Sequence, residues 1–320
     1  MTRPINGLHH VTAIASDPQR NLDFYAGVLG LRLVKRTVNF DDPGTYHFYF
    51  GNELGEPGTL LTFFPWPGAR RGIAGAGQIR RTALSVPQEA LGFWRDRLRS
   101  QNVDVEPVTH GDGELLRLRD PDGLELELVA DPAAAQLPAT HSGPVPEEAA
   151  IRSLFGVTLV EADLERTARQ LEETLGFRHL GDTAGGVRYS AGGEHGRVVE
   201  LRAASEGPGR IAAGSVHHVA FRVPDDATQQ AWRGKVADAG LSVTPVIDRN
   251  YFHSIYFREP GGVLFEIATD PPGFTVDEPA AELGTTLRLP PQYESRRSQI
   301  EATLPAVTLP AEAALLGPES

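Results

Sequence analysis

The sequence predicts an α+β protein in which four βαβββ units pair into two curved half-barrel domains. Two pairs of matching segments support this prediction. Leu8–Asp17 matches Leu154–Asp163, and a glycine follows both segments at the same spacing. Asp120–Glu127 matches Glu259–Glu266, and a strand-like start precedes both at nearly the same distance. Segments that share a start and an interior landmark indicate an internal repeat, so the repeat defines the predicted fold.

The repeat divides most of the chain into four units. They cover roughly residues 7–66, 77–130, 151–203 and 214–270. One such unit has too small an apolar core to fold alone, so we expect the units to pair through their sheets. The sequence thus predicts an N-terminal domain over 1–130, a Pro- and Ala-rich linker over 131–150 and a C-terminal domain over 151–270. A Pro-punctuated tail, 271–320, is expected to wrap the body and to fray from about Ala306.

Each unit has the same internal order. A short strand-like run comes first, such as Val216–Val223, which is rich in valine and phenylalanine. Helices are predicted next, at Asn21–Leu29, Glu89–Ser100, Leu164–Leu175 and Ala227–Ala239. Three of these helices end at a glycine in the position of a C-cap, namely Gly30, Gly176 and Gly240. Further strands follow, for example Tyr46–Phe50, Thr59–Phe64, Ser254–Phe257 and Val263–Ala268, and one more helix is predicted in the tail near Gln292–Leu304.

The composition excludes several classes of protein. The 320 residues contain 30 Lys+Arg and 42 Asp+Glu, a net charge of −12. No apolar run approaches the roughly 18 residues that a membrane span needs, and no secretory h-region is visible. The acidic balance has no block of cations, which argues against nucleic-acid binding because phosphate neutralisation needs clustered Lys and Arg. We therefore expect a cytoplasmic protein whose partners include neither nucleic acid nor membrane, and leave open whether it forms a homo-oligomer.

The chain has no cysteine. This excludes disulfides, iron–sulfur clusters, a cysteine nucleophile and thiolate zinc sites. Any metal must be held by histidine, carboxylate and water, a set of ligands that suits a hard or borderline ion.

Alignment of the four units places polar residues at two equivalent positions. The inner position of the first strand holds His10, Arg81, Gly156 and His218. The equivalent position of the last strand holds Thr62, Glu127, Glu200 and Glu266. If unit one pairs with unit four, their shared interior presents two histidines and one glutamate, with a threonine at the fourth place. If unit two pairs with unit three, their interior presents no histidine, so we expect no metal there.

His10, His218 and Glu266 together have the composition of a non-haem Fe(II) site. Two imidazoles and one carboxylate on one face of the ion leave coordination positions open. A lone histidine in a strand is more often structural, but here both His-His pairs fall at equivalent positions of the repeat, which favours metal binding. Thr12 lies two residues from His10 on the same strand face, where its hydroxyl can reach a bound oxygen species.

Other histidines receive less support from the repeat. His9 and His217 point to the opposite strand face in ideal β geometry, so they reach the site only if the strands twist or bulge. His253 lies in the segment DRNYFHSIY and is the one additional histidine expected near the pocket. The remaining histidines have no equivalent in the other units, and most are expected to be exposed: His47, His110, His141, His179 and His195.

The repeat and the three ligands resemble the vicinal oxygen chelate superfamily, which includes glyoxalase I, bleomycin-resistance proteins and extradiol dioxygenases. Six motifs more narrowly resemble the (chloro)hydroquinone 1,2-dioxygenase group, and the resemblance covers nearly the whole chain. These motifs are Leu8–Thr12, Leu33–Phe40, Gly214–Phe221, Asp248–Tyr256, Val263–Asp270 and Pro290–Arg297.

The resemblance implies a glyoxalase-like fold and an enzyme that opens an aromatic ring bearing para-related hydroxyls. It implies a ferrous ion, or Mn(II) in some members, on the same three ligands that the repeat indicates. It further implies a small aromatic substrate and O2 as reaction partners. The residues that match its catalytic positions are His9, Thr12, His217, Arg249 and Tyr256.

Three other functions remain open at this stage. An extradiol catechol dioxygenase has similar architecture, but such enzymes usually draw all three ligands from one domain, whereas His10 lies far from the other two. A glyoxalase-like isomerase or lyase usually needs a fourth protein ligand, and Thr62 argues against it. A non-catalytic sequestering protein of the superfamily would lack the metal ligands, so the His/His/Glu set disfavours it.

Overall fold

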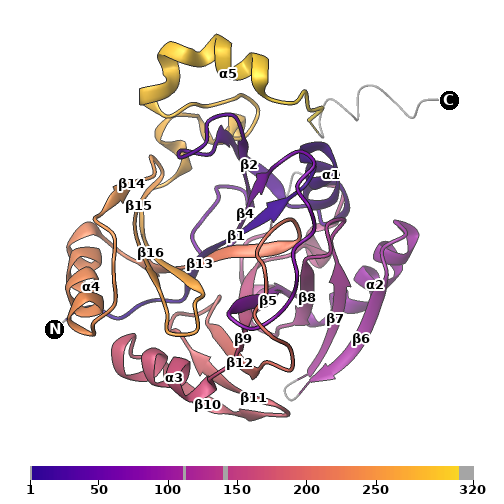
Figure 1. Ribbon diagram of the computed structural model, residues 1–320. Coiled ribbons are helices and arrows are strands. Elements are labelled where there is room, and N and C mark those ends of the chain that lie inside the picture. The colour runs from indigo at the N-terminus through magenta and orange to yellow at the C-terminus, as the bar shows by residue number, and fades with distance from the viewer. Residues whose placement is uncertain (1, 111–112, 140–142, 310–320) are drawn as a thin grey trace.

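The structure, a computed structural model, describes residues 2–110, 113–139 and 143–309. Strands of units four and one form one sheet of eight strands (Figure 1). In spatial order these strands are β14 (Ile247–Asp248), β15 (Phe252–Arg258), β16 (Leu264–Pro272), β13 (Ser215–Val223), β1 (Leu8–Ala15), β4 (Leu60–Pro65), β3 (Tyr46–Gly51) and β2 (Arg32–Val38). We call this sheet the first half-barrel.

The strands of units three and two form the second half-barrel, which also has eight strands. Their spatial order is β10 (Arg178–Thr183), β11 (Gly186–Ser190), β12 (Val198–Ala203), β9 (Ser153–Glu161), β5 (Gln78–Val86), β8 (Glu125–Ala130), β7 (Gly113–Arg119) and β6 (Val105–His110). The predicted fold class and the pairing of unit one with four and of two with three are thus confirmed. The domain limits at residues 130, 150 and 270 stay a prediction.

Each half-barrel is built around an antiparallel pair of first strands with a local two-fold relation. In the first half-barrel, His10 lies opposite Ala220, and Thr12 lies opposite His218. Each first strand then pairs in parallel with the last strand of its own unit, β1 with β4 and β13 with β16. The register puts Thr62 beside Thr12 and Glu266 beside Ala220, two residues past the respective histidines. The equivalences inferred from the repeat are therefore equivalences in space.

The helices end within one residue of the predicted positions, but the first begins at Pro18 rather than Asn21, and they are not α-helical throughout. Asp17 caps α1 (Pro18–Leu22) by accepting a hydrogen bond from the Arg20 amide, and Asp163 caps α3 (Leu164–Arg169) in the same way. Both helices then continue as π-helical turns, Asp23–Val28 and Gln170–Thr174. The other helices are α2 (Leu91–Ser100), α4 (Asp226–Asp238) and α5 (Arg297–Thr303). The three predicted C-cap glycines all have positive φ, namely Gly30, Gly176 and Gly240.

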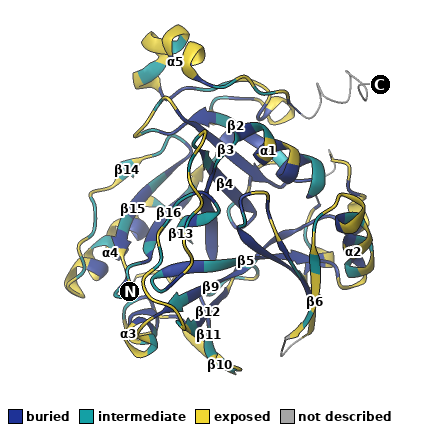
Figure 2. Cartoon of the chain, turned by 45° about the vertical axis from the view of Figure 1, so that its right-hand side comes forward, coloured by how far each residue is buried: buried dark blue, intermediate teal, exposed yellow. Residues whose placement is uncertain are grey.

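The central strands of the sheets are largely buried on both faces (Figure 2), whereas outer strands such as β10 are exposed. Every residue of β1 is buried. On the side of α1, the Tyr25 ring packs on Phe50 and Phe63, with centroids 5.5 and 4.3 Å apart. The opposite, concave side of the first half-barrel therefore holds the polar residues that the repeat singled out.

The tail lies against unit one. Tyr46 donates a hydrogen bond to the Pro305 carbonyl, and Tyr293 donates one to the Phe40 carbonyl. The predicted tail helix is a 3-10 turn followed by α5, which projects at the surface (Figures 1 and 2). Of the predicted frayed end, Leu309 is buried, and 310–320 lie outside the described residues. None of the helices in the described ranges has the length and apolar character needed to cross a bilayer.

Candidate metal centre

Three buried side chains meet on the concave face of the first half-barrel, where β1, β13 and β16 are neighbours. The Nε2 atoms of His10 and His218 lie 3.3 and 2.9 Å from Glu266 Oε2 and 3.2 Å from each other. The three residues are at most 5% exposed, and their ligand atoms all lie within 4.8 Å of one another. The pairing of unit one with unit four thus brings together the three residues that the sequence indicated.

The chemistry of this donor set fits a divalent metal ion. Glu266 Oε2 is buried and has no hydrogen-bond partner among the described residues, whereas Ser254 donates one to Oε1. Burial alone raises the pKa of Glu266, but the imidazoles of His10 and His218 outweigh it and hold the pKa well below its usual value. An ionised carboxylate oxygen without a hydrogen bond therefore faces two imidazole nitrogens, which is what a divalent cation requires.

His9 and His217 reach the site because both strands bulge. The pairing of β1 with β13 shifts register between Leu8 and His10, and again on β13 between Val216 and His218. As a result, His9 Nδ1 lies 2.9 Å from His10 Nδ1. His217 Nδ1 lies 2.8 Å from His218 Nδ1 in the same way. Each flanking histidine therefore fixes the ring of its neighbour and leaves that neighbour's Nε2 for the metal.

His9 links this arrangement to the backbone. Its Nε2 donates to the carbonyl of Thr269, 3.2 Å away on β16. Burial and the adjacent His10 hold the pKa of His9 well below its usual value, so the ring is neutral and its Nδ1 accepts from His10. The Phe252 ring packs against the rings of His9 and His10, with centroid distances of 4.9 and 5.1 Å. The ring of His10 is therefore held in place from two sides.

Tyr256 and Arg249 lie on the side of the site formed by unit four. Tyr256 is paired with Glu266 across β15 and β16, and its ring centroid is 5.8 Å from that of His218. Arg249 donates through Nε to the Tyr256 hydroxyl at 3.2 Å and stacks over the Tyr256 ring. Burial and the charge of Glu266 raise the pKa of Tyr256, so its hydroxyl stays protonated and can donate a hydrogen bond. Arg249 also pairs with Asp41 at 3.3 Å, so it is not a free surface cation.

A chain of three polar side chains lies on the opposite side, in unit one. Thr12 Oγ1 is 2.7 Å from Thr62 Oγ1, which is 2.9 Å from His47 Nε2. Thr62 occupies the place that is related to Glu266 by the local two-fold. It is too short to act as a fourth ligand of the same kind, and both of its neighbours engage its hydroxyl.

The expectation of exposure is wrong for His47, which is 9% exposed and lies beside the site. The alignment of the four units did not place His47 at the site, but its strand register does. His47 on β3 is equivalent to Ser254 on β15, because Tyr49 pairs with Thr62 as Tyr256 pairs with Glu266. His47 thus hydrogen-bonds to Thr62, and Ser254 hydrogen-bonds to Glu266, the two equivalent last-strand residues.

The other histidines lie away from the metal centre. His253 faces outward and pairs with Asp226 at 2.6 Å, so it is not a pocket residue. His179 is exposed and His195 partly exposed. The side chain of His110 and the whole of His141 lie outside the described residues.

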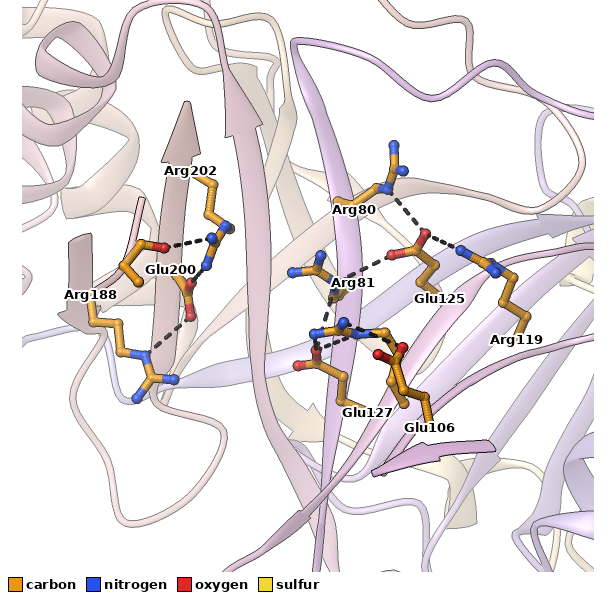
Figure 3. Close-up of polar contacts among 11 residues, drawn as sticks. Arg80, Arg81, Glu106, Arg119, Glu125, Glu127, Arg188, Glu200 and Arg202 are labelled. Carbon is orange, nitrogen blue, oxygen red and sulfur yellow. Dashed lines mark hydrogen bonds and ion pairs between the residues drawn. The ribbon is translucent and has the colours of Figure 1, made fainter. Parts of the chain in front are cut away.

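The equivalent positions of the second half-barrel hold ion pairs (Figure 3). Glu127 accepts from Arg117 at 2.9 Å and lies 3.6 Å from Arg81. Glu200 accepts from Arg188 at 3.1 Å and from Arg202 at 2.7 Å. Arg117 and Arg188 occupy the strand position that Tyr256 holds in unit four. A guanidinium therefore neutralises each carboxylate that would otherwise be free for a metal, which supports the expectation that no metal binds there.

Comparison with known proteins agrees with this geometry. The model of the Glyoxalase/Bleomycin resistance protein/Dioxygenase superfamily matches residues 7–128 and 154–267. MhqO of Bacillus subtilis (strain 168), named as a ring-cleaving dioxygenase, is 48% identical over 304 residues, which are 95% of this chain and 97% of that protein. A solved structure described as a dioxygenase from the same species superposes with a TM-score of 0.93 at 48% identity, covering 96% of this chain and 99% of that one.

A more distant relative carries a more specific name. The chlorohydroquinone/hydroquinone 1,2-dioxygenase of Sphingobium indicum is 36% identical over 311 residues, which are 94% of this chain and 96% of that protein. The family model covers both halves of the repeat, and the relatives match nearly end to end. The chain therefore belongs to the Glyoxalase/Bleomycin resistance protein/Dioxygenase superfamily, in which it is similar over nearly its whole length to proteins named as ring-cleaving dioxygenases.

Proposed function

We propose that this protein is a ring-cleaving dioxygenase that uses Fe(II) to insert both atoms of O2 into a hydroquinone-type aromatic ring. The observation that carries the proposal is the buried set of His10, His218 and Glu266, with donor atoms within 4.8 Å and no fourth His or carboxylate ligand among the described residues. The name of the relative from Sphingobium indicum supports the hydroquinone class of substrate. Mn(II) is the second metal that this set of ligands can serve.

A ferrous ion bound there would lower the pKa of a phenol and bring it into contact with O2. The protein's own residues then act around it. Tyr256, held by Arg249, donates a hydrogen bond to an oxygen of the substrate on the unit-four side. Thr12 presents its hydroxyl to an oxygen on the unit-one side. His9 and His217 keep the two ligand imidazoles oriented, and the burial of the site excludes water.

The place opposite Glu266 separates this proposal from a glyoxalase-like reaction. A lyase of that kind uses a further carboxylate to move a proton, but Thr62 stands at that place and is bonded to Thr12 and His47. For a catechol dioxygenase, the ligands would come from one pair of consecutive units. Here His10 comes from unit one, and the other two ligands come from unit four.

The test is oxygen uptake after anaerobic reconstitution with Fe(II). The substrates are hydroquinone, chlorohydroquinone and catechol, and Glu266→Gln serves as the inactive control. We expect uptake with the para-diols, one O2 consumed per ring opened, and none with the variant. Uptake with catechol alone would move the assignment to the extradiol class, and no uptake with any phenol would remove it. A cytoplasmic location stays a prediction that fractionation can test, and light scattering would decide whether the protein forms a homo-oligomer.

A further inference from the structure

The fourth place around the local two-fold, where no proposed ligand stands, belongs to unit one. His10, His218 and Glu266 occupy three of the four places that the local two-fold generates, and Thr62 occupies the fourth. A threonine is shorter than a glutamate by two chain atoms, so it leaves space between its hydroxyl and the ion. A substrate that binds the ion there extends from the metal towards Thr62 and the strands beyond it.

His47 is the next polar group in that direction. It lies on β3, which β4 separates from β1, so its backbone is two strand spacings, or about 10 Å, from that of the ligand strand. Its ring is bracketed by Tyr49 and Phe64, with centroids 4.0 and 4.4 Å away. Only Nε2 has a hydrogen-bond partner, Thr62, and Nδ1 has none among the described residues. His47 is therefore a rigidly held, nine-tenths buried imidazole with one unused nitrogen.

The bond to Thr62 places the His47 imidazole beside the metal centre, and its electrostatic surroundings keep the ring neutral. Burial, and then the charges of His10 and His218, hold the pKa of His47 well below its usual value. Arg249 on the far side contributes in the same direction. A neutral imidazole offers one donor and one acceptor, so Nδ1 can bond a hydroxyl whichever way the Thr62 bond runs.

We propose that His47 is a specificity-determining residue that binds the hydroxyl para to the metal-bound oxygen. This inference rests on the proposed function and names its substrate class, the para-dihydroxy aromatics. In a para-diol, one oxygen binds the ion and the other lies at the far end of the ring, beside His47. An ortho-diol places both oxygens at the ion and offers no hydroxyl to His47 Nδ1.

The test measures binding rather than turnover. Anaerobic calorimetry on metal-loaded protein gives dissociation constants for hydroquinone and phenol, which differ only in the para hydroxyl. We expect wild type to bind hydroquinone about 5- to 10-fold more tightly than phenol, which is the gain that one hydrogen bond can give. In His47→Phe the ratio of the hydroquinone affinity to the phenol affinity should fall to near one, while the phenol affinity is kept. His47→Gln should restore part of the preference for hydroquinone. His179→Phe, an exposed site in the second half-barrel, is the matched control.

A wild-type ratio near one, or an unchanged ratio in His47→Phe, overturns the inference. If His47→Phe fails to fold, as thermal melts and metal content reveal, nitrogen NMR of wild type with diamagnetic Zn(II) decides instead. Hydroquinone should then shift the Nδ1 resonance of His47 and phenol should not, and equal shifts overturn the inference. Failure of the proposed function looks different, because wild type would consume no O2 with any phenol although the binding ratio could still be read.

Discussion

At the scale of single residues, the metal centre depends on side chains that hold the ligands rather than on the ligands alone. Ser254 donates to Glu266 Oε1 and leaves Oε2 facing the two imidazoles. The serine is itself fully buried. Its hydroxyl therefore fixes which carboxylate oxygen faces the two imidazoles and would bind the proposed metal ion.

Ser254→Ala is expected to weaken metal binding by about 10- to 100-fold, because Glu266 loses the bond that orients it. Competition with a chelator under anaerobic conditions measures this change. The control is Ser153→Ala, a buried serine on β9 whose hydroxyl has no partner in the described part of the chain. An affinity equal in all three proteins would contradict the orienting role.

The sequence predicted the three ligands because they fall at positions that repeat along the chain. His47 was missed because its equivalent, Ser254, is a different residue type, and only the strand register relates the two. The contacts of His9 and His217 required two bulges, which depend on how β1 and β13 meet and leave no periodic signal. Local spacing thus indicates which residues meet, and tertiary pairing decides which atoms touch.

At the scale of elements, a buried lysine fastens the tail to the first half-barrel. Lys35 on β2 is fully buried and pairs with Asp277 at 2.6 Å and with Glu278. It also lies 4.9 Å above the Tyr251 ring, whose hydroxyl donates to Asp277. The ammonium group of Lys35 on β2 therefore contacts both the tail and the loop before β15.

Lys35→Met should lower the free energy of unfolding by as much as about 3 kcal/mol, because it leaves the buried Glu278 without its main partner. Chemical denaturation measures the loss. The double variant Lys35→Met/Glu278→Gln removes the orphaned charge and should recover most of it. If the double variant is no more stable than the single one, the unpaired charge is not the cause.

A second element-scale feature lies where β9 meets the turn between β15 and β16. Glu161 is fully buried, and neither of its carboxylate oxygens has a hydrogen-bond partner among the described residues. Burial and the charge of Glu259 raise its pKa from 4.5 to about 8. The folded protein therefore holds a proton here that the unfolded chain releases near its ordinary pKa.

A raised pKa makes stability fall as the pH rises. Between about pH 4.5 and pH 8 the folded state binds more protons at Glu161 than the unfolded state, so wild type loses stability across this range. Because a glutamine does not titrate, Glu161→Gln should lose less stability than wild type as the pH rises. Melting temperatures of both proteins against pH test this, and parallel curves would contradict it. Burial also raises the pKa of Asp120, to about 6, but Asp120 is present in wild type and in Glu161→Gln, so its contribution cancels in the comparison.

At the scale of the whole molecule, the candidate metal centre joins the first and last of the four repeat units. β1 lies near the N-terminus and β16 precedes the tail, yet both are neighbours of β13 in one sheet. The sequence predicted this closure because only that pairing collects two histidines and a glutamate. It did not predict that the helices of units one and three end as π-helical turns, since packing against the sheet, not residue pattern, selects that geometry.

Because the ion would link units one and four, it should stabilise the fold by mass action. At about a thousand times its dissociation constant, a bound metal adds roughly 4 kcal/mol. Melts with and without Mn(II) or Fe(II) should therefore differ for wild type and coincide for His218→Ala. Coincident melts for wild type would argue against a bridging ion.

The most direct test of the account is the metal content of His10→Ala after anaerobic loading with Fe(II) and desalting. His10 is the only proposed ligand from unit one, so the account predicts one ferrous ion per chain in wild type and in His179→Ala, but almost none in His10→Ala. A His10→Ala protein that keeps its full ferrous content would contradict a metal centre shared between the first and last units.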